Sequence, residues 1–131
     1  MASIRTEIPL DAGAEDVWAA VRDIGALHTR LVPGFVTDTQ LEPGARIVTF
    51  GNGMVARELI VDLDDQAWRL VWSAVGGRLT HHNASAQVFA EGDTRSRLVW
   101  TADLLPDELA GDIRTMMEHG AAAMQKVFTK R

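Results

Sequence analysis

The stretch GARIVTFGNGMVARELIVDLDDQAWRLVWSAV, residues 44–75, decides the fold. It holds three short runs rich in β-branched and aromatic residues, which are typical of strands. Turn-forming residues separate the runs, with Gly51-Asn52-Gly53 after the first and Leu63-Asp64-Asp65-Gln66 after the second. Short strands that follow one another through tight turns pair as antiparallel neighbours. The stretch therefore predicts a β-meander.

The meander continues on both sides of this stretch. We predict six strands, each ended by residues that tolerate tight turns, over residues 35–41, 46–50, 54–62, 68–75, 80–90 and 95–104. Near the N-terminus, Ile4, Thr6 and Ile8 alternate with polar residues, which is the pattern of a strand with one buried face. The chain thus contains seven strands, the first of them separated from the other six.

Helices are predicted in the remaining segments. Glu15 and Asp16 suit the positive end of a first short helix, and a second helical turn covers residues 24–30 before Pro33-Gly34. Residues 107–130 form one long amphipathic helix, because their apolar side chains fall within about a 100° sector of a helical wheel. These residues are Leu109, Ile113, Met116, Met117, Gly120, Met124 and Val127. The fold class is therefore α+β.

Composition excludes several classes of function. The 131 residues, 47% hydrophobic and 24% charged, predict a single globular domain over 1–131. A net charge of −5 has the wrong sign for a nucleic-acid partner, and the absence of cysteine excludes thiol chemistry. Neither a signal-peptide-like run nor about twenty consecutive apolar residues are present, so we expect no membrane insertion and a cytoplasmic location.

Neither a metal nor a cofactor is expected. His81 and His82 are adjacent, and neighbouring residues of a strand point to opposite faces, so the two rings cannot chelate one ion together. The expected partner is a small hydrophobic molecule, and the sequence is compatible with a homodimer.

In a hairpin, the sequence numbers of any two paired residues add up to the same total, which is set by the centre of the turn. The positions of the turns therefore predict which side chains stand opposite each other. Under this rule Arg46 faces Glu58, Glu58 faces Trp72, Trp72 faces His82, and His82 faces Leu104. The even-numbered face of the meander would then be the interior. A slip of one residue at any turn would invert the assignment for that strand.

The direction of Glu58 stays open on pattern alone. The odd-numbered face of its strand, with Val55, Leu59 and Val61, is at least as apolar as the even-numbered one. If Glu58 points inward it needs a partner such as Arg46, since an unpaired buried carboxylate costs several kcal/mol or becomes protonated.

The order of strand, two short helices, six strands and long helix resembles the START-like helix-grip superfamily, also called SRPBCC. This superfamily includes polyketide cyclase/dehydrases, lipid-transfer proteins and plant hormone receptors. The resemblance covers nearly the whole chain and rests on VWAAVRDIGALHTRLVPG from Val17, the stretch from Gly44, and RSRLVWTADLLP from Arg95. It implies a curved seven-stranded antiparallel sheet that grips the long helix, with an elongated cavity between them.

The resemblance also suggests pocket residues. In the hormone receptors the Glu of the motif corresponding to ARELIVDLDD lines the pocket, which favours an inward Glu58. The matching residues on later strands would be Trp72, His82 and Trp100. The absence of tyrosine removes a residue type that some aromatase/cyclase members use for proton transfer.

The leading hypothesis is binding of a small, mostly apolar, aromatic or polyketide-like ligand in a cavity of about 300 Å³ or more. The predicted contacts are Arg46, Glu58, Trp72, His82, Leu98, Trp100, Met116, Gly120 and Met124. One alternative is a polyketide cyclase/dehydrase-type enzyme in which Glu58 and His82 contact opposite sides of a carbonyl or hydroxyl compound as base and acid. Another is a regulatory or interaction module with a vestigial cavity, which a filled interior with no pocket of about 300 Å³ or more would favour. A purely structural Arg46–Glu58 pair, with His82 capped by backbone, is the remaining interpretation.

Overall fold

The computed structural model describes residues 1–129 and contains one curved antiparallel sheet and one long helix. The strands are β1 (Ala2–Leu10), β2 (Val36–Glu42), β3 (Ala45–Phe50), β4 (Val55–Asp64), β5 (Arg69–Val75), β6 (His81–Ala90) and β7 (Ser96–Leu105). The helical segments are α1 (Ala14–Arg22), the short turns η1 (Ile24–Ala26), η2 (Leu27–Leu31) and η3 (Asp107–Leu109), and α2 (Ala110–Val127). The predicted α+β helix-grip architecture is confirmed.

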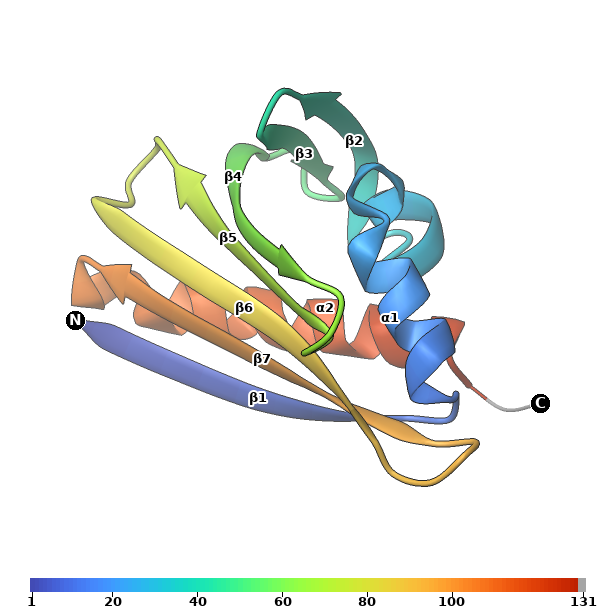
Figure 1. Ribbon diagram of the computed structural model, residues 1–131. Helices are drawn as coiled ribbons and strands as arrows, with labels where there is room; N and C mark the ends of the chain where they lie inside the picture. Colours follow the sequence, from blue (N-terminus) through green and yellow to red (C-terminus); the bar gives the residue numbers. More distant parts are fainter. Residues whose placement is uncertain (130–131) are drawn as a thin grey trace.

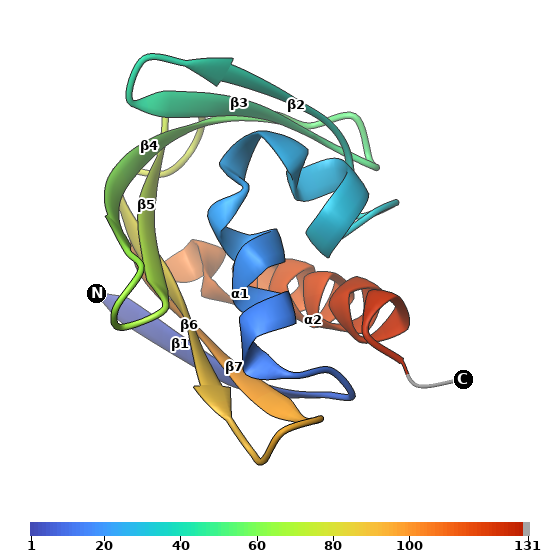
Figure 2. The same ribbon diagram turned by 45° about the vertical axis from the view of Figure 1, so that its right-hand side comes forward.

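The sheet has the strand order β1-β7-β6-β5-β4-β3-β2, so the meander is continuous and β1 adds to its last strand. Figures 1 and 2 show α2 running along the concave side of the sheet, while the turns η1 and η2 lie against β2 and α1 contacts β6 and β7. The turn η2 contacts both β2 and α2. The concave face is therefore covered by two separate helical segments.

The predicted long helix is shorter than expected. Its first three residues form the turn η3, and α2 ends at Val127, two residues before the last described position. The predicted end at Lys130 lies outside the described residues. The buried face of α2 carries Met117, Gly120 and Met124, which belong to the predicted apolar stripe. None of the helices within residues 1–129 has the length and apolarity needed to cross a membrane.

The register confirms two of the four predicted pairs. Arg46 lies opposite Glu58 across β3 and β4, and His82 lies opposite Leu104 across β6 and β7. Side chains on paired positions share a face, so these pairs fix the direction of β3 relative to β4 and of β6 relative to β7.

The other two predicted pairs are wrong by two residues. Glu58 lies opposite Ala74 instead of Trp72, and Trp72 lies opposite Ala84 instead of His82. Because side chains alternate with a period of two, a shift of two residues leaves each side chain on its predicted face. The even-numbered side chains of the central strands accordingly still face the helix.

A β-bulge at Val61 ends this alternation within β4. Ile60 pairs with Trp72 and Asp62 pairs with Val71, which leaves Val61 as the extra residue on the bulged strand. Beyond the bulge the odd-numbered Leu63 packs against the core. A bulge increases local twist and bending, which is consistent with the strong curvature of β4 in Figure 2.

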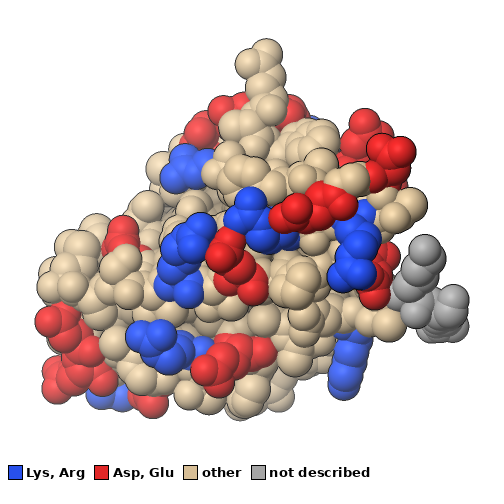
Figure 3. All heavy atoms as spheres, turned by 90° about the horizontal axis from the view of Figure 1, so that it is seen from below, with Lys and Arg blue, Asp and Glu red and all other residues tan. Residues whose placement is uncertain are grey.

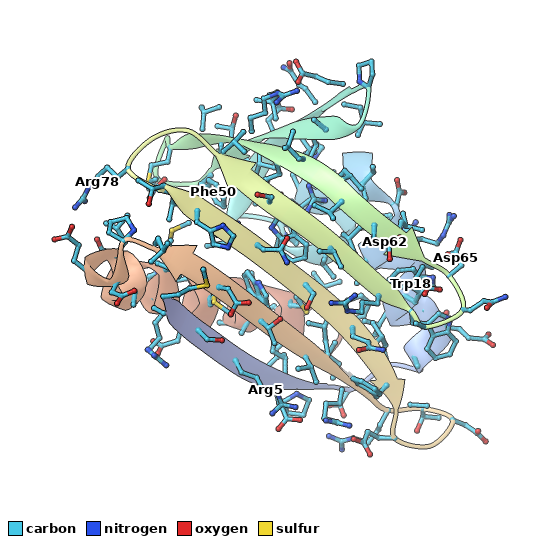
Figure 4. All side chains as sticks on the ribbon, turned by 60° about the vertical axis from the view of Figure 1, so that its left-hand side comes forward. Arg5, Trp18, Phe50, Asp62, Asp65 and Arg78 are labelled. Carbon is cyan, nitrogen blue, oxygen red and sulfur yellow. The ribbon has the colours of Figure 1, made fainter. Side chains whose placement is uncertain are left out.

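One polar cluster ties α1 to the turn between β4 and β5. Trp18 donates from Nε1 to Oδ1 of Asp65 at 2.9 Å, and Arg22 binds the same carboxylate at 2.8 Å. Figure 4 shows Trp18 and Asp65 at one end of the sheet and Phe50 and Arg78 at the other. The pKa of Asp65 is held below its ordinary value by the hydrogen bond from Arg22, with the Trp18 bond second.

The exposed charges are mixed. On the face shown in Figure 3, acidic and basic side chains are interspersed and do not gather by sign. Several exposed arginines form ion pairs, as Arg57 does with Glu42 at 3.0 Å and Arg97 with Glu91 at 2.9 Å. Such a surface has no large region of a single charge on this side.

Candidate functional site

A cavity of about 170 Å³ lies between the concave face of the sheet, α2 and η2. Its wall is largely apolar and is formed by Val21, Leu27, Leu31, Val32, Phe35, Val36, Arg46, Phe50, Met54, Ala56, Glu58, Leu70, Trp72, Ala74, Leu79, His82, Ala86, Leu98, Trp100, Ala102, Ile113, Met116, Met117 and Met124. The interior is hollow, but the volume is below the 300 Å³ expected from the sequence.

All of the predicted binding residues except Gly120 line this cavity. They are Arg46, Glu58, Trp72, His82, Leu98, Trp100, Met116 and Met124. They come from β3, β4, β5, β6, β7 and α2, so the fold brings together side chains spread over much of the chain. Their roles in binding stay predictions.

Gly120 does not line the cavity. It lies on α2 behind the indole of Trp100, which does line the cavity. A Cβ atom at this residue would lie 2.8 Å from Cζ3 of Trp100 and 3.2 Å from Cε2 of Phe35. Distances this short are not tolerated between such atoms without movement. Gly120 therefore allows the indole of Trp100 to lie directly against α2.

The charged part of the wall is a buried ion pair. Arg46 donates from Nε to Oε1 of Glu58 at 2.9 Å and from a terminal nitrogen to the carbonyl oxygen of Ile24 at 3.3 Å. Arg46 is 3% exposed and Glu58 is 7% exposed. Since unpaired charges are costly in such a place, each residue allows the other to be buried. Glu58 points inward, which settles the direction that the apolar pattern left open.

The guanidinium of Arg46 also lies over the ring of Trp72, 5.8 Å from its centroid. Trp72 in turn contacts Trp100, with ring centroids 6.4 Å apart and the planes inclined by 47°. The ion pair and the two indoles consequently form one continuous surface along the cavity.

The second oxygen of Glu58 remains available. Among the hydrogen bonds within residues 1–129, those reaching the Glu58 carboxylate end on Oε1. Oε2 is also not among the fully buried polar atoms without a partner. Because Glu58 lines the cavity, Oε2 can accept a hydrogen bond from a molecule inside it.

His82 presents the complementary group. Its Nδ1 accepts a hydrogen bond from the backbone N–H of Ala74 at 2.9 Å. A backbone N–H can only donate, so the proton of the neutral ring resides on Nε2. Burial lowers the pKa of His82, the neighbouring His81 lowers it further, and Asp103 opposes them. At neutral pH His82 is thus an uncharged ring that can donate from Nε2.

The hydrogen-bonded pairing of β5 with β6 ends next to His82. The backbone ladder between β5 and β6 stops at the pair Trp72–Ala84, and the bond from Ala74 to the His82 ring replaces the next step. A second, more open hollow of about 390 Å³ lies here, and Ala74, Leu79 and His82 line both it and the main cavity. His82 therefore lies where the main cavity and this outer hollow adjoin.

Two aromatic residues of the wall were missed by the sequence analysis. Phe35 and Phe50 contact each other edge to face, with ring centroids 5.4 Å apart. The signal for Phe50 was present, since it shares the even-numbered face of β3 with Arg46. Phe35 lies outside the strands, after Gly34, where alternation gives no information on direction.

Metal ligands are not gathered anywhere in the described part of the chain. Among residues 1–129, three His, Asp or Glu side chains do not come close enough together to hold an ion.

Comparisons with known proteins give the family. The family model described as "Polyketide cyclase / dehydrase and lipid transport" matches residues 1–131. Comparison with curated protein sequences finds no match.

Many solved structures are similar to this chain, and three of them illustrate the likeness over almost its whole length. XoxI from Bacillus cereus has a TM-score of 0.87 at 18% identity, covering 98% of this chain and 96% of that one. A START superfamily protein from Mycobacterium smegmatis has a TM-score of 0.77 at 12% identity, covering 96% of each. A norcoclaurine synthase point mutant from Thalictrum flavum, in complex with a transition-state analogue, has a TM-score of 0.71 at 16% identity, covering 97% and 93%. At these identities the likeness shows the fold, and it is the family model spanning the full length that places the chain in the polyketide cyclase / dehydrase and lipid transport family.

Proposed function

We propose that the protein binds a small, neutral, mostly apolar molecule, about the size of one substituted aromatic ring, between the sheet and α2. The observation that carries this proposal is an apolar cavity of about 170 Å³ whose charged residues, Arg46 and Glu58, neutralise each other. An apolar protein cavity of about 150 Å³ is large enough to hold benzene.

The size narrows the hypothesis made from the sequence. A multi-ring polyketide or a two-chain lipid is larger than this cavity, whereas a single ring with one or two substituents is not. Trp72 and Trp100 supply aromatic faces, which favour offset or edge-on contact with another ring. Met116 and Met124 add flexible apolar side chains that adapt to an irregular outline.

The four tryptophans allow a direct test. Phenol, toluene and indole are titrated into ¹⁵N-labelled protein, and the indole Nε1–H signals are followed by NMR. We expect shifts for Trp72 and Trp100, which line the cavity, and little change for Trp18 and Trp68, which do not. Equal shifts of all four signals would indicate nonspecific association and contradict the proposal.

A variant that fills the cavity provides the second arm. Ala86 is buried and lines the cavity, so Ala86→Leu should weaken binding of each probe at least about tenfold, the equivalent of about 1.4 kcal/mol. Ala90 lies on the same strand but is exposed, and Ala90→Leu is the matched control that should leave binding unchanged. If none of the probes binds the wild-type protein, the interaction-module alternative becomes the better interpretation.

An enzyme of the cyclase/dehydrase type is the second candidate, favoured by the placement of Glu58 and His82 on one cavity wall. In a dehydration, Oε2 of Glu58 would take the proton next to a ketone and pass it to the departing hydroxyl, while Nε2–H of His82 holds that hydroxyl by a hydrogen bond and keeps its own proton. The C–H and C–O bonds break, a C=C bond forms, and water leaves. The similar norcoclaurine synthase was solved with a transition-state analogue, which shows that this fold can host a reaction.

Diacetone alcohol is a suitable probe for this reaction because its dehydration product, mesityl oxide, absorbs in the ultraviolet. The enzyme hypothesis predicts product formation that Glu58→Gln and His82→Phe each abolish, with a loss of turnover much larger than the loss of affinity for the alcohol. Absence of turnover in the wild-type protein, with binding intact, would leave ligand binding as the function.

A further inference from the structure

We propose that the cavity is selective for a hydroxyl group on its ligand, which it distinguishes from a carbonyl or methyl group at the same position. The elements of this selectivity are Glu58, Ala74 and His82, on three adjacent strands. The inference rests on the proposed function, because it names the polar group of the molecule bound there.

The three residues form a row across the sheet. Glu58 on β4 lies directly opposite Ala74 on β5, and the backbone N–H of Ala74 binds the His82 ring on β6. Two strand spacings separate the backbones of Glu58 and His82 by roughly 9–10 Å, too far for a short direct bond between the carboxylate and the ring. All three residues line the cavity. The methyl group of Ala74 is the shortest side chain of the row and leaves room between the two polar ones.

Of the polar groups on the two sides of Ala74, one is a hydrogen-bond acceptor and the other is a hydrogen-bond donor. The Glu58 carboxylate, paired with Arg46 through Oε1, has only acceptor capacity, and Oε2 is the oxygen without a bond among residues 1–129. The His82 ring has its acceptor nitrogen occupied by Ala74, so Nε2–H is its remaining group and is a donor.

A hydroxyl group satisfies both sides, since it can accept from His82 Nε2–H and donate to Glu58 Oε2. A carbonyl oxygen can only accept, so it would leave Oε2 facing another acceptor. A methyl group would leave both partners without a bond. A site built to bond a hydroxyl rejects analogues lacking it strongly, because its own polar groups are then buried unpaired.

Ala74 acts as a positioning residue in this arrangement. Its backbone N–H fixes the proton of His82 on Nε2, and this decides that the ring offers a donor to the cavity. The opposite tautomer would offer an acceptor on each side of Ala74, and the row would then favour a ligand with two donors.

The test uses two matched pairs of probes at about pH 7.5, where burial keeps His82 neutral. Phenol and toluene differ in hydroxyl against methyl, and benzyl alcohol and benzaldehyde differ in hydroxyl against carbonyl. Dissociation constants come from the Trp72 and Trp100 NMR signals. We expect each hydroxyl compound to bind at least about tenfold more tightly than its partner.

Glu58→Gln gives the decisive variant. The glutamine retains an oxygen for Arg46 Nε but presents an NH₂ donor in place of Oε2. The preference within the second pair should therefore invert, with benzaldehyde binding more tightly than benzyl alcohol. Glu42→Gln is the matched control, because Glu42 is exposed and pairs with Arg57 outside the cavity. It should leave both preferences as in the wild type.

The outcomes separate this inference from the proposed function. Binding of all four probes with no preference for the hydroxyl, or a preference that Glu58→Gln leaves unchanged, overturns hydroxyl selectivity while ligand binding stands. Absence of binding by every probe overturns the proposed function itself. Should Glu58→Gln fail to fold, the ¹⁵N shifts of the His82 ring in the wild type decide: a proton on Nδ1 contradicts the inference, and a proton on Nε2 whose shift responds to benzyl alcohol supports it.

Discussion

The indole of Trp100 lies against the backbone of Gly120, so that a Cβ atom at the glycine would stand 2.8 Å from Cζ3 of the ring. This contact sets the distance between β7 and α2, and Trp100 at the same time forms part of the cavity wall. Any atom added to Gly120 must push the ring toward the cavity or the helix away from the sheet.

Gly120→Ala should therefore lower the free energy of unfolding by about 1–3 kcal/mol, the usual cost of overpacking, despite the better helix propensity of alanine. Gly111, in the same helix, has open space where its Cβ would be, and is the control. Gly111→Ala should stabilise the protein by up to about 1 kcal/mol. Urea denaturation followed by circular dichroism measures both, and equal effects of the two variants would contradict the close contact.

The ion pair between Arg46 and Glu58 predicts strongly coupled effects. Glu58→Ala leaves the buried guanidinium without its carboxylate, which should cost about 3–5 kcal/mol. Replacing both residues, by Arg46→Met and Glu58→Leu together, should recover at least half of that loss, because no uncompensated charge remains. The exposed pair provides the comparison: Glu42→Ala should cost about 0–1 kcal/mol. Near-additive losses in the double variant would show that the pair is not coupled.

Stability should fall in mildly acidic solution because of His82. Burial holds the pKa of this residue below its ordinary value of 6.5, so the unfolded chain takes up a proton at a pH where the folded protein still resists it. Wherever the unfolded state binds more protons, the free energy of unfolding decreases as the pH falls. The loss therefore begins near pH 6.5 and grows toward the lower pKa of the folded state, while above about pH 7.5 His82 contributes no slope.

Urea denaturation at several pH values between about 7.5 and 5.5 measures this dependence. His82→Gln should reduce the slope, because glutamine does not titrate. His119 is exposed on α2, so His119→Gln should retain the wild-type slope. A slope that His82→Gln leaves unchanged would show that other groups produce it.

The order of the strands could be predicted from the sequence because turn residues separate each strand of the meander from the next. The pairing registers of β4 with β5 and of β5 with β6 could not be predicted. Gly76 and Gly77 predict the centre of the turn between β5 and β6, and both do have the positive φ typical of turns, at 94° and 64°. In the structure, however, they stand at the start of a longer loop. The true centre is one residue further along, which shifts the pairing of Trp72 from His82 to Ala84. The preceding register is also displaced by two residues, in a ladder that the bulge at Val61 interrupts.

The inward direction of Glu58 could not be derived from hydrophobic pattern, because the outer face of β4 is itself apolar. Val55 and Val61 are 63% and 57% exposed, although they gave the odd-numbered face its hydrophobic appearance. What permits Glu58 to be buried is the arginine opposite it on β3, a relationship between strands. The volume of the cavity depends on how Phe35 and its neighbours fill the space, and such packing is not encoded in alternation.

Because Arg46 and Glu58 neutralise each other, the cavity is unfavourable for charged compounds. An ionised guest such as benzoate or benzylammonium would give up its hydration shell on entry and meet two opposite charges already satisfied by one another. One free acceptor, Oε2 of Glu58, and one donor, Nε2–H of His82, replace only a small part of that hydration. The cavity therefore selects for neutral compounds. Acids and amines whose rings would fit bind weakly while they are ionised, and they bind more tightly in their neutral form.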